Sequence, residues 1–139
     1  MVLVGSGSMC GTIKTVIDKR REVGVKVGLV KMRMYRPFPS EVLVAALKGK
    51  RAIGVVDRSL AFGFKGGPIY TELKAFETQL EGSKMISFLD GIANTDITTA
   101  NVGQMIDTIC DLAAGKEVRE VTWVCYPEAH EALPKTGGQ

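Results

Sequence analysis

The stretch MVLVGSGSMCG, residues 1–11, joins a short apolar run to a turn rich in glycine and serine. An apolar run that does not alternate with polar residues is typical of a parallel strand buried on both faces. From residue 8 to about residue 23, apolar side chains recur at helical spacing, and Gly24 stands where a glycine commonly ends a helix. The chain therefore opens with a strand–turn–helix unit, the repeating element of α/β proteins.

The same alternation continues along the chain. Further strands are predicted over residues 25–30 (with an extension as far as 34), 51–56 and 84–89. Further helices are predicted from Ser40 to Lys48, from Pro68 to about Leu80, and from Thr98 to Gly115, with Ser40 and Thr98 as candidate N-caps. This order predicts a three-layer α/β/α sandwich around a mostly parallel sheet of four to five strands.

The last part of the chain departs from the alternation. We assign residues 1–115 to the α/β domain and residues 116–139 to a C-terminal extension. Within the extension, residues 121–126 are a candidate edge strand. The final residues form a polar tail that is expected to reach toward a partner or to fray.

Composition and charge exclude several classes of protein. The chain has 139 residues, of which 45% are hydrophobic and 24% charged, and its net charge is +3. Lys and Arg are spread along the chain, which argues against a nucleic-acid partner, and no apolar run approaches the ~20 residues that span a bilayer. Three widely spaced cysteines predict a reducing, cytoplasmic location, with no iron–sulfur or zinc site in this domain.

The turn at residues 5–11 is the first candidate site, because backbone N–H groups between a strand and a helix can hold an anion. The candidate anion-binding residues are Gly5, Ser6, Gly7 and Ser8. The spacing G-x-G-x-x-x-G departs from the dinucleotide fingerprint G-x-G-x-x-G. Basic residues follow the second strand where an acid would bind NAD, which suits NADP better. The alternative is that these glycines only tighten the turn.

The loop at residues 57–67 is the second candidate site, because ligands of α/β sheets bind where strands end. Asp57 and Arg58 begin this loop, and either they contact a partner or they form an ion pair with each other. Phe62 and Phe64 are unusually apolar for a loop, which predicts that they pack on another subunit.

The segment at residues 33–39 is a third candidate site. Arg36 and Phe38 lie beside two prolines, and arginine and aromatic residues are enriched in interface cores. A solvated turn is the alternative. The residues predicted to form an interface are therefore Arg36, Phe38, Asp57, Arg58, Phe62 and Phe64.

The chain offers few groups for catalysis. His130 is the only histidine, so a histidine-based triad or metal site lacks its partners. Asp90 and Asp96 resemble an acid pair, but capping and loop hydrogen bonds are the expected roles. We predict no catalytic residue and no metal site.

Four motifs in order carry a resemblance to a known family. They are VGSGSM at residues 4–9, RPFP at 36–39, VDR at 56–58 with FGF at 62–64 and GG at 66–67, and GIANTDIT at 91–98. Together they resemble the C-terminal domain of the α-chain in pyruvate and 2-oxoacid:ferredoxin oxidoreductases, over about residues 1–113. Tyr35 stands where that family usually has phenylalanine before Arg-Pro, a conservative difference.

The resemblance implies a fold similar to the transketolase C-terminal domain. Family members cleave 2-oxoacids oxidatively to acyl-coenzyme A with thiamin diphosphate, Mg²⁺ and iron–sulfur clusters, and they pass electrons to ferredoxin. The resemblance implies that these cofactors sit in other domains or subunits of an oligomeric enzyme, and that this domain supports assembly and is inactive alone. Two alternatives stay open: a stand-alone module that binds a phosphorylated ligand such as NADP, and the C-terminal domain of another transketolase-type thiamin enzyme.

Overall fold

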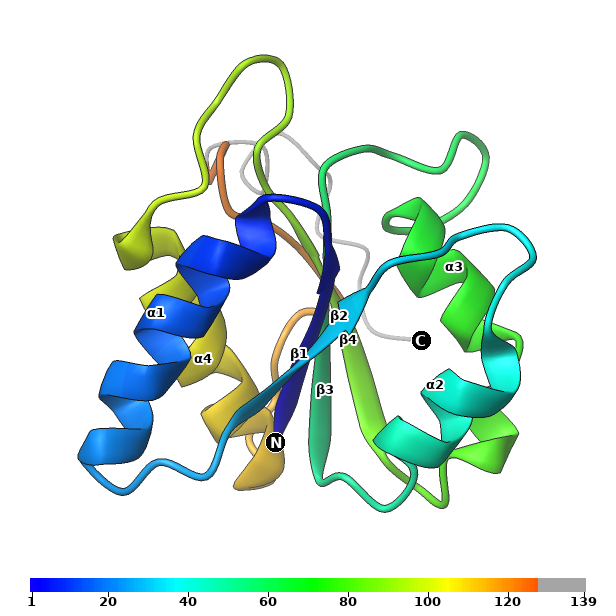
Figure 1. Cartoon of the computed structure of the whole chain (residues 1–139), viewed down its shortest axis with the longest axis horizontal. Helices are drawn as coiled ribbons and strands as arrows, with labels where there is room; N and C mark the ends of the chain where they lie inside the picture. The colour runs from blue at the N-terminus through cyan, green and yellow to red at the C-terminus, as the bar shows by residue number, and fades with distance from the viewer. Residues whose placement is uncertain (128–139) are drawn as a thin grey trace.

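A computed structural model describes residues 1–127 and places five parallel strands between two layers of helices (Figure 1). The strands are β1 (Val2–Ser6), β2 (Gly28–Met32), β3 (Ala52–Asp57), β4 (Lys84–Leu89) and β5 (Val121–Trp123). The helices are α1 (Met9–Glu22), α2 (Ser40–Leu47), α3 (Pro68–Lys74) and α4 (Thr99–Ala113), with a short 3₁₀ helix, η1 (Glu77–Gln79). The strand order is β2-β1-β3-β4-β5. The predicted three-layer α/β/α class is confirmed.

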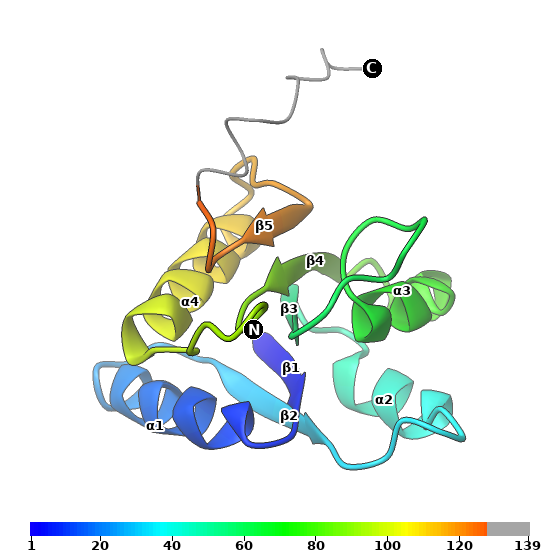
Figure 2. The ribbon, with the colours of Figure 1, turned by 90° about the horizontal axis from the view of Figure 1, so that it is seen from above.

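Two apolar cores hold the layers together. One lies between the sheet and the pair α1 and α4, and the other between the sheet and the pair α2 and α3 (Figure 2). Gly54, in the middle of β3, allows close packing in the core under α1 and α4, because a Cβ there would lie 2.7 Å from both Leu3 and Phe88. The missing side chain lets Ile109 of α4 approach the sheet.

The helix ends follow the sequence signals in two places. After α1, Gly24 has a φ of 91°, and the Val25 N–H donates to the Arg20 carbonyl across the helix end. At the start of α4, Thr98 Oγ1 accepts a hydrogen bond from the Asn101 N–H at 3.1 Å. Both signals therefore mark the helix ends that the sequence predicted.

Other boundaries differ from the sequence prediction. Strand β2 begins only at Gly28, because Gly28 pairs with Val2, the first residue of β1, and earlier residues have no strand beside them. Ser40 is the first residue of α2, whose N-cap is Pro39. The helix predicted to reach Leu80 ends at Lys74 and tightens into η1.

The fifth strand comes from beyond residue 115. Strand β5 is shorter than the predicted 121–126 and pairs in parallel with β4. The domain boundary at residue 115 stays a prediction. Within residues 1–127, no helix is long and apolar enough to cross a bilayer. The predicted tail from 128 onward, including His130, lies outside the described residues.

Candidate functional site

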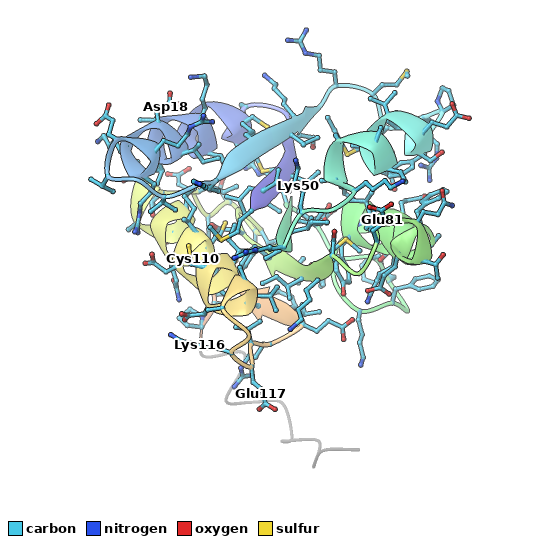
Figure 3. The ribbon with its side chains drawn as sticks, turned by 90° about the horizontal axis from the view of Figure 1, so that it is seen from below. Asp18, Lys50, Glu81, Cys110, Lys116 and Glu117 are labelled. Atoms are coloured by element: carbon cyan, nitrogen blue, oxygen red, sulfur yellow. The ribbon has the colours of Figure 1, made fainter. Side chains whose placement is uncertain are left out.

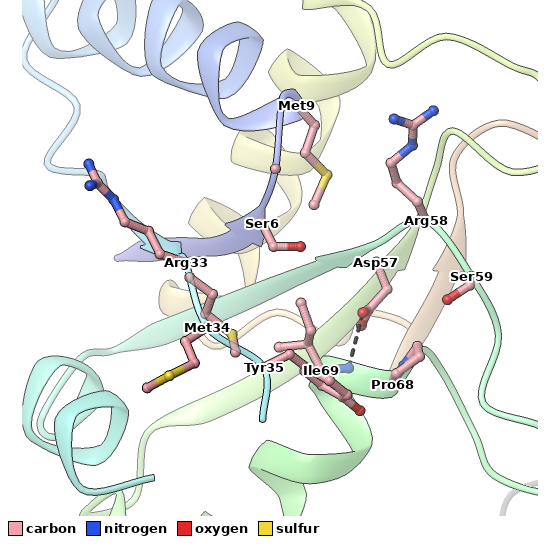
Figure 4. A pocket seen from close by; sticks show the side chains of 12 residues that line it. Ser6, Met9, Arg33, Met34, Tyr35, Asp57, Arg58, Ser59, Pro68 and Ile69 are labelled. Carbon is pink, nitrogen blue, oxygen red and sulfur yellow. Dashed lines mark hydrogen bonds between the residues drawn. The ribbon is translucent and has the colours of Figure 1, made fainter. Parts of the chain in front are cut away.

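The carboxyl ends of β1, β2 and β3 surround a pocket of about 370 Å³ (Figure 4). Parallel strands end at the same edge of the sheet, and ligand sites of open α/β sheets lie at that edge. The pocket gathers residues from all three segments that the sequence singled out. Those that matter most below are Ser6, Met9, Arg33, Tyr35, Asp57 and Arg58.

The turn between β1 and α1 forms one wall of this pocket. Gly7 has a φ of 69°, which favours glycine. A Cβ on Gly5 would meet Met9 at 3.3 Å, so Gly5 serves the close packing of α1 on β1. Ser6 lines the pocket, whereas Ser8 lines a neighbouring hollow of about 310 Å³. Of the predicted anion-binding residues, Gly5 therefore serves packing, Ser6 and Gly7 line the pocket, and Ser8 lines the neighbouring hollow. Anion binding by these residues stays a prediction.

Asp57, the last residue of β3, has its carboxylate engaged inside the domain. It accepts hydrogen bonds from the backbone N–H groups of Ile69 at 3.0 Å and Tyr70 at 3.1 Å, and so it caps α3 (Figure 4). The side chain is only 3% exposed. Burial raises the pKa of Asp57 to about 6, although the two N–H donors act in the opposite direction. The carboxylate therefore faces α3, and the predicted interface role of Asp57 stays a prediction.

The cap explains the pair of glycines before α3. A Cβ on Gly67 would lie 2.1 Å from the Asp57 Cβ, far inside any allowed contact. Gly66 has a φ of 83°, and a Cβ there would lie 2.7 Å from the Tyr70 ring. Both glycines are therefore needed to bring the start of α3 against the end of β3.

Arg58 projects into solvent from the same strand end. It forms no ion pair with Asp57, and within residues 1–127 no carboxylate lies within salt-bridge distance of it. The Arg58 side chain packs against the backbone of Gly91, since a Cβ on Gly91 would lie 2.8 Å from the Arg58 Nε. Its charge acts on the buried Asp90, whose pKa burial raises while hydrogen bonds from Asn101 and Gly91 oppose the change. Asp90 thus has the loop-bonding role that the sequence suggested.

The segment at residues 33–39 is fixed to the domain by two contacts. Arg36 forms a salt bridge with Glu72 of α3 and lies 4.2 Å above the centre of the Tyr35 ring. Phe38 is half-buried and stacks on Phe76 with ring centres 6.2 Å apart. Both residues have partners inside the domain, and their predicted interface role stays a prediction.

Phe62 and Phe64 occupy the tip of the loop that follows Asp57. Their side chains are 94% and 68% exposed. The loop is nonetheless closed on itself, since the Ala61 N–H donates to the Gly66 carbonyl and the Phe64 N–H to the Ala61 carbonyl, each at 3.1 Å. Two exposed aromatic rings on a closed loop are the arrangement that the interface hypothesis requires, and their interface role stays a prediction.

One polar contact joins residues that no sequence pattern links. The Tyr70 hydroxyl donates to Glu120 at 2.7 Å, and Lys74 lies 3.5 Å from the same carboxylate. The hydrogen bond from Tyr70 lowers the pKa of Glu120. Glu120 directly precedes β5, so this contact ties the last strand to α3. Fifty residues separate Tyr70 from Glu120, and no local pattern could have paired them.

The described residues do not form a metal site. Within residues 1–127, no group of three or more His, Cys, Asp or Glu side chains is arranged to hold a metal ion. The three cysteines are free, and burial raises the pKa of Cys10. This edge of the sheet therefore carries an acid that caps α3, an exposed arginine and an exposed apolar loop.

The chain matches a known protein family over most of its length. The family model for pyruvate:ferredoxin oxidoreductase core domain II matches residues 1–102. The chain belongs to this family. The matched region contains β1 to β4, the pocket and the Asp57 cap, and the recognition made from the four sequence motifs is confirmed.

Curated relatives carry the same region inside longer subunits. The chain is 34% identical to pyruvate synthase subunit PorA of Methanothermobacter thermautotrophicus, over 94% of this chain and 32% of that protein. It is 41% identical to the alpha subunit of NADH-dependent phenylglyoxylate dehydrogenase of Aromatoleum evansii, over 73% of this chain and 24% of that protein. It is 35% identical to ketoisovalerate oxidoreductase subunit VorA of Pyrococcus furiosus, over 88% and 31%. The chain spans about a third or less of these relatives.

Proposed function

We propose that this chain is the domain II part of the α-chain of a 2-oxoacid:ferredoxin oxidoreductase, and that it serves assembly rather than chemistry. Family membership supports the first part, and it sets aside another transketolase-type thiamin enzyme. The relatives are named for pyruvate, ketoisovalerate and phenylglyoxylate, which are all 2-oxoacids. The proposed reaction of the whole enzyme is oxidative decarboxylation of a 2-oxoacid to an acyl-coenzyme A.

The cofactors of that reaction are proposed to bind elsewhere in the enzyme. A magnesium–diphosphate group needs several oxygen ligands, and the described residues do not fit it, since no three-ligand group exists among residues 1–127. Asp57, which lines the pocket, already accepts hydrogen bonds from the N-terminus of α3. We therefore assign thiamin diphosphate, Mg²⁺, iron–sulfur clusters, coenzyme A and the ferredoxin contact to other domains or subunits.

The exposure of Phe62 and Phe64 is the observation that carries the assembly role. Burying a phenylalanine side chain contributes about 1.5–3 kcal/mol, so covering both rings would contribute several kcal/mol to association. Large exposed apolar side chains gathered on one surface commonly mark an interaction site. The closed loop presents both rings in one arrangement, which lowers the entropy lost on binding.

The test is association with the other subunits of the same oxidoreductase, co-expressed with the complete α-chain. The double variant Phe62→Ser, Phe64→Ser should lower the yield of assembled enzyme at least tenfold, because the loss of two buried rings exceeds ~1.4 kcal/mol. Val42→Ser is the matched control, since Val42 is 71% exposed on α2. Equal assembly of the loop variant, the control and the wild type would refute the assembly role.

A second function is favoured by one observation. Ser6 and Arg33 line the same pocket, as a phosphate site for NADP would require. Calorimetric titration of the chain with NADP separates the two proposals. A saturable heat signal that is lost in Arg33→Ala would support NADP binding. The absence of heat from the wild type would refute NADP binding.

A further inference from the structure

The pocket at the carboxyl end of the sheet is apolar inside and positively charged at its rim. Met9, Met32 and Ile69 are buried in its wall, and Met34 is half exposed beside it. Figure 4 shows the Met9 side chain and the Ser6 hydroxyl inside the ring of lining residues. Methionine side chains are flexible and polarizable, so such a wall adapts to the shape of an inserted apolar group.

The rim charges come from Arg33 and Arg58, which extend from opposite sides of the pocket (Figure 4). Both side chains are exposed, and neither lies within salt-bridge distance of a carboxylate in the part of the chain that the structure describes. Asp57 cannot neutralise them at close range, because its carboxylate is turned toward α3. Asp96 lines the neighbouring hollow with Arg58 but forms no ion pair with it. The rim therefore attracts carboxylates.

The apolar surface continues beyond the pocket. Residues 1–127 contain seven large exposed hydrophobic side chains, and five of them follow β2 or β3 at this end of the sheet. These five are Met34, Tyr35, Leu60, Phe62 and Phe64. The opposite end of the sheet presents mixed charges instead, with Lys50, Glu81 and Glu117 among them (Figure 3). A small ligand would fill the pocket but leave the loop uncovered, so a polypeptide fits this surface better.

We propose that the pocket docks a segment of a partner subunit that inserts an apolar side chain against Met9 and Met34 and places carboxylates beside Arg33 and Arg58. This inference rests on the proposed function, because the partner is sought among the other subunits of the same oxidoreductase. It adds the chemistry of the partner: an acidic segment with an apolar anchor. The pocket volume of about 370 Å³ suits an anchor of side-chain size.

Charge and shape separate this occupant from two others. A second copy of the chain, related by a two-fold axis, would bring Arg33 and Arg58 toward the same arginines, and like charges across an interface oppose binding. An anionic membrane would attract the arginines, but it offers no shaped group to fill a pocket. Both occupants are outcomes of the test below.

The test measures the dissociation constant between the complete α-chain and the remaining subunits, at several salt concentrations. The double variant Arg33→Glu, Arg58→Glu should raise the dissociation constant about tenfold or more and flatten its salt dependence, because rim charges act through screened attraction. Met34→Trp, which fills the pocket from an exposed position, should raise it by a similar factor. Lys26→Glu and Val23→Trp are matched controls from exposed positions at the other end of the sheet, and they should leave it unchanged.

The outcomes separate this inference from the proposed function. If the pocket variants associate like the wild type and the Phe62, Phe64 variant does not, docking at the pocket is refuted and the assembly role is kept. No association by the wild type would remove both. A loss of self-association, seen by analytical ultracentrifugation, would assign the pocket to a second copy and overturn the inference. Arginine-dependent binding to phosphatidylserine vesicles, without effect on the subunits, would overturn it in favour of a membrane.

All five substituted side chains are exposed or half exposed, so the variants should fold. Far-UV circular dichroism and the urea midpoint of each variant verify this, since surface substitutions usually change stability by less than about 0.5 kcal/mol. A variant that keeps the wild-type midpoint and loses association reports on docking alone.

Discussion

Replacing Gly67 with alanine should strongly destabilise the chain, because the added methyl group would occupy the place of Asp57. The new Cβ would lie 2.1 Å from the Asp57 Cβ, 2.3 Å from its Cγ and 2.4 Å from its Oδ2. An ordinary contact is at least 3.4 Å, so Asp57 and α3 must separate by more than 1 Å. Such a shift breaks the hydrogen bonds to Ile69 and Tyr70, which are 3.0 and 3.1 Å long.

The magnitude follows from the groups that would be left unpaired. Each buried N–H without a partner costs about 1–3 kcal/mol, so the loss of the cap alone costs about 2–6 kcal/mol. Domains of this size have a total stability of about 5–15 kcal/mol, so a large part of it would be lost. Each kcal/mol lowers the melting temperature of a domain of this size by roughly 4 °C, which predicts a fall of about 8 °C or more.

Urea unfolding followed by circular dichroism measures this change. Gly11→Ala is the control, because Gly11 lies within α1 with nothing within 4 Å of the added Cβ. Alanine is the better helix former by about 1 kcal/mol, so the control should gain stability. The reasoning about the cap would be refuted if Gly67→Ala cost less than about 1 kcal/mol or matched the control in sign.

Three further predictions follow from single contacts. Folding raises the pKa of Asp57 from 3.8 to about 6. The contribution of Asp57 to stability is therefore greatest below pH 3.8 and falls, by up to about 3 kcal/mol, as the pH rises through 6. The variant Asp57→Asn should remove this part of the pH dependence of the unfolding free energy. Tyr70→Phe removes a 2.7 Å hydrogen bond to Glu120 and should cost about 1–2 kcal/mol in urea unfolding, whereas Glu120→Gln keeps an acceptor and should cost less. Thr98→Ala removes the cap of α4 and should cost about 1 kcal/mol, with Thr98→Ser as the rescue variant.

Local sequence signals predicted most of the framework, because the buried strands and helix ends depend on neighbouring residues. The run Val2–Val4 is apolar on both faces, and such a run has one stable place in an α/β protein, inside a covered parallel sheet. Gly24 and Thr98 end and begin helices through contacts within a few residues of themselves. The start of β2 was not predicted correctly, because it depends on where β1 begins. Gly28 pairs with Val2, which lies twenty-six residues earlier in the sequence.

The candidate site was predicted only in part. The sequence showed that the turn after β1, the loop after β2 and the loop after β3 each carried unusual residues, and parallel topology brings all three to one edge. It did not show the direction of the Asp57 side chain, which depends on the close approach of Gly67. The residues that form the cap were nevertheless visible in the sequence, with Asp57 at the strand end and Gly66-Gly67-Pro68 at the start of the helix.

The cap also bears on the docking role that we propose for this edge of the sheet. In an α/β enzyme, free N–H groups at a helix start and an acid at a strand end would both be available to a ligand. Here the acid and the N–H groups bond to each other. The Asp57 carboxylate accepts hydrogen bonds from the first N–H groups of α3, which would otherwise be available to a ligand. The same contact fixes both ends of the loop that carries Phe62 and Phe64, because Asp57 precedes the loop and Gly67 follows it. A loop held at both ends keeps its aromatic tip exposed and ordered in one place, which is the property that a docking surface requires.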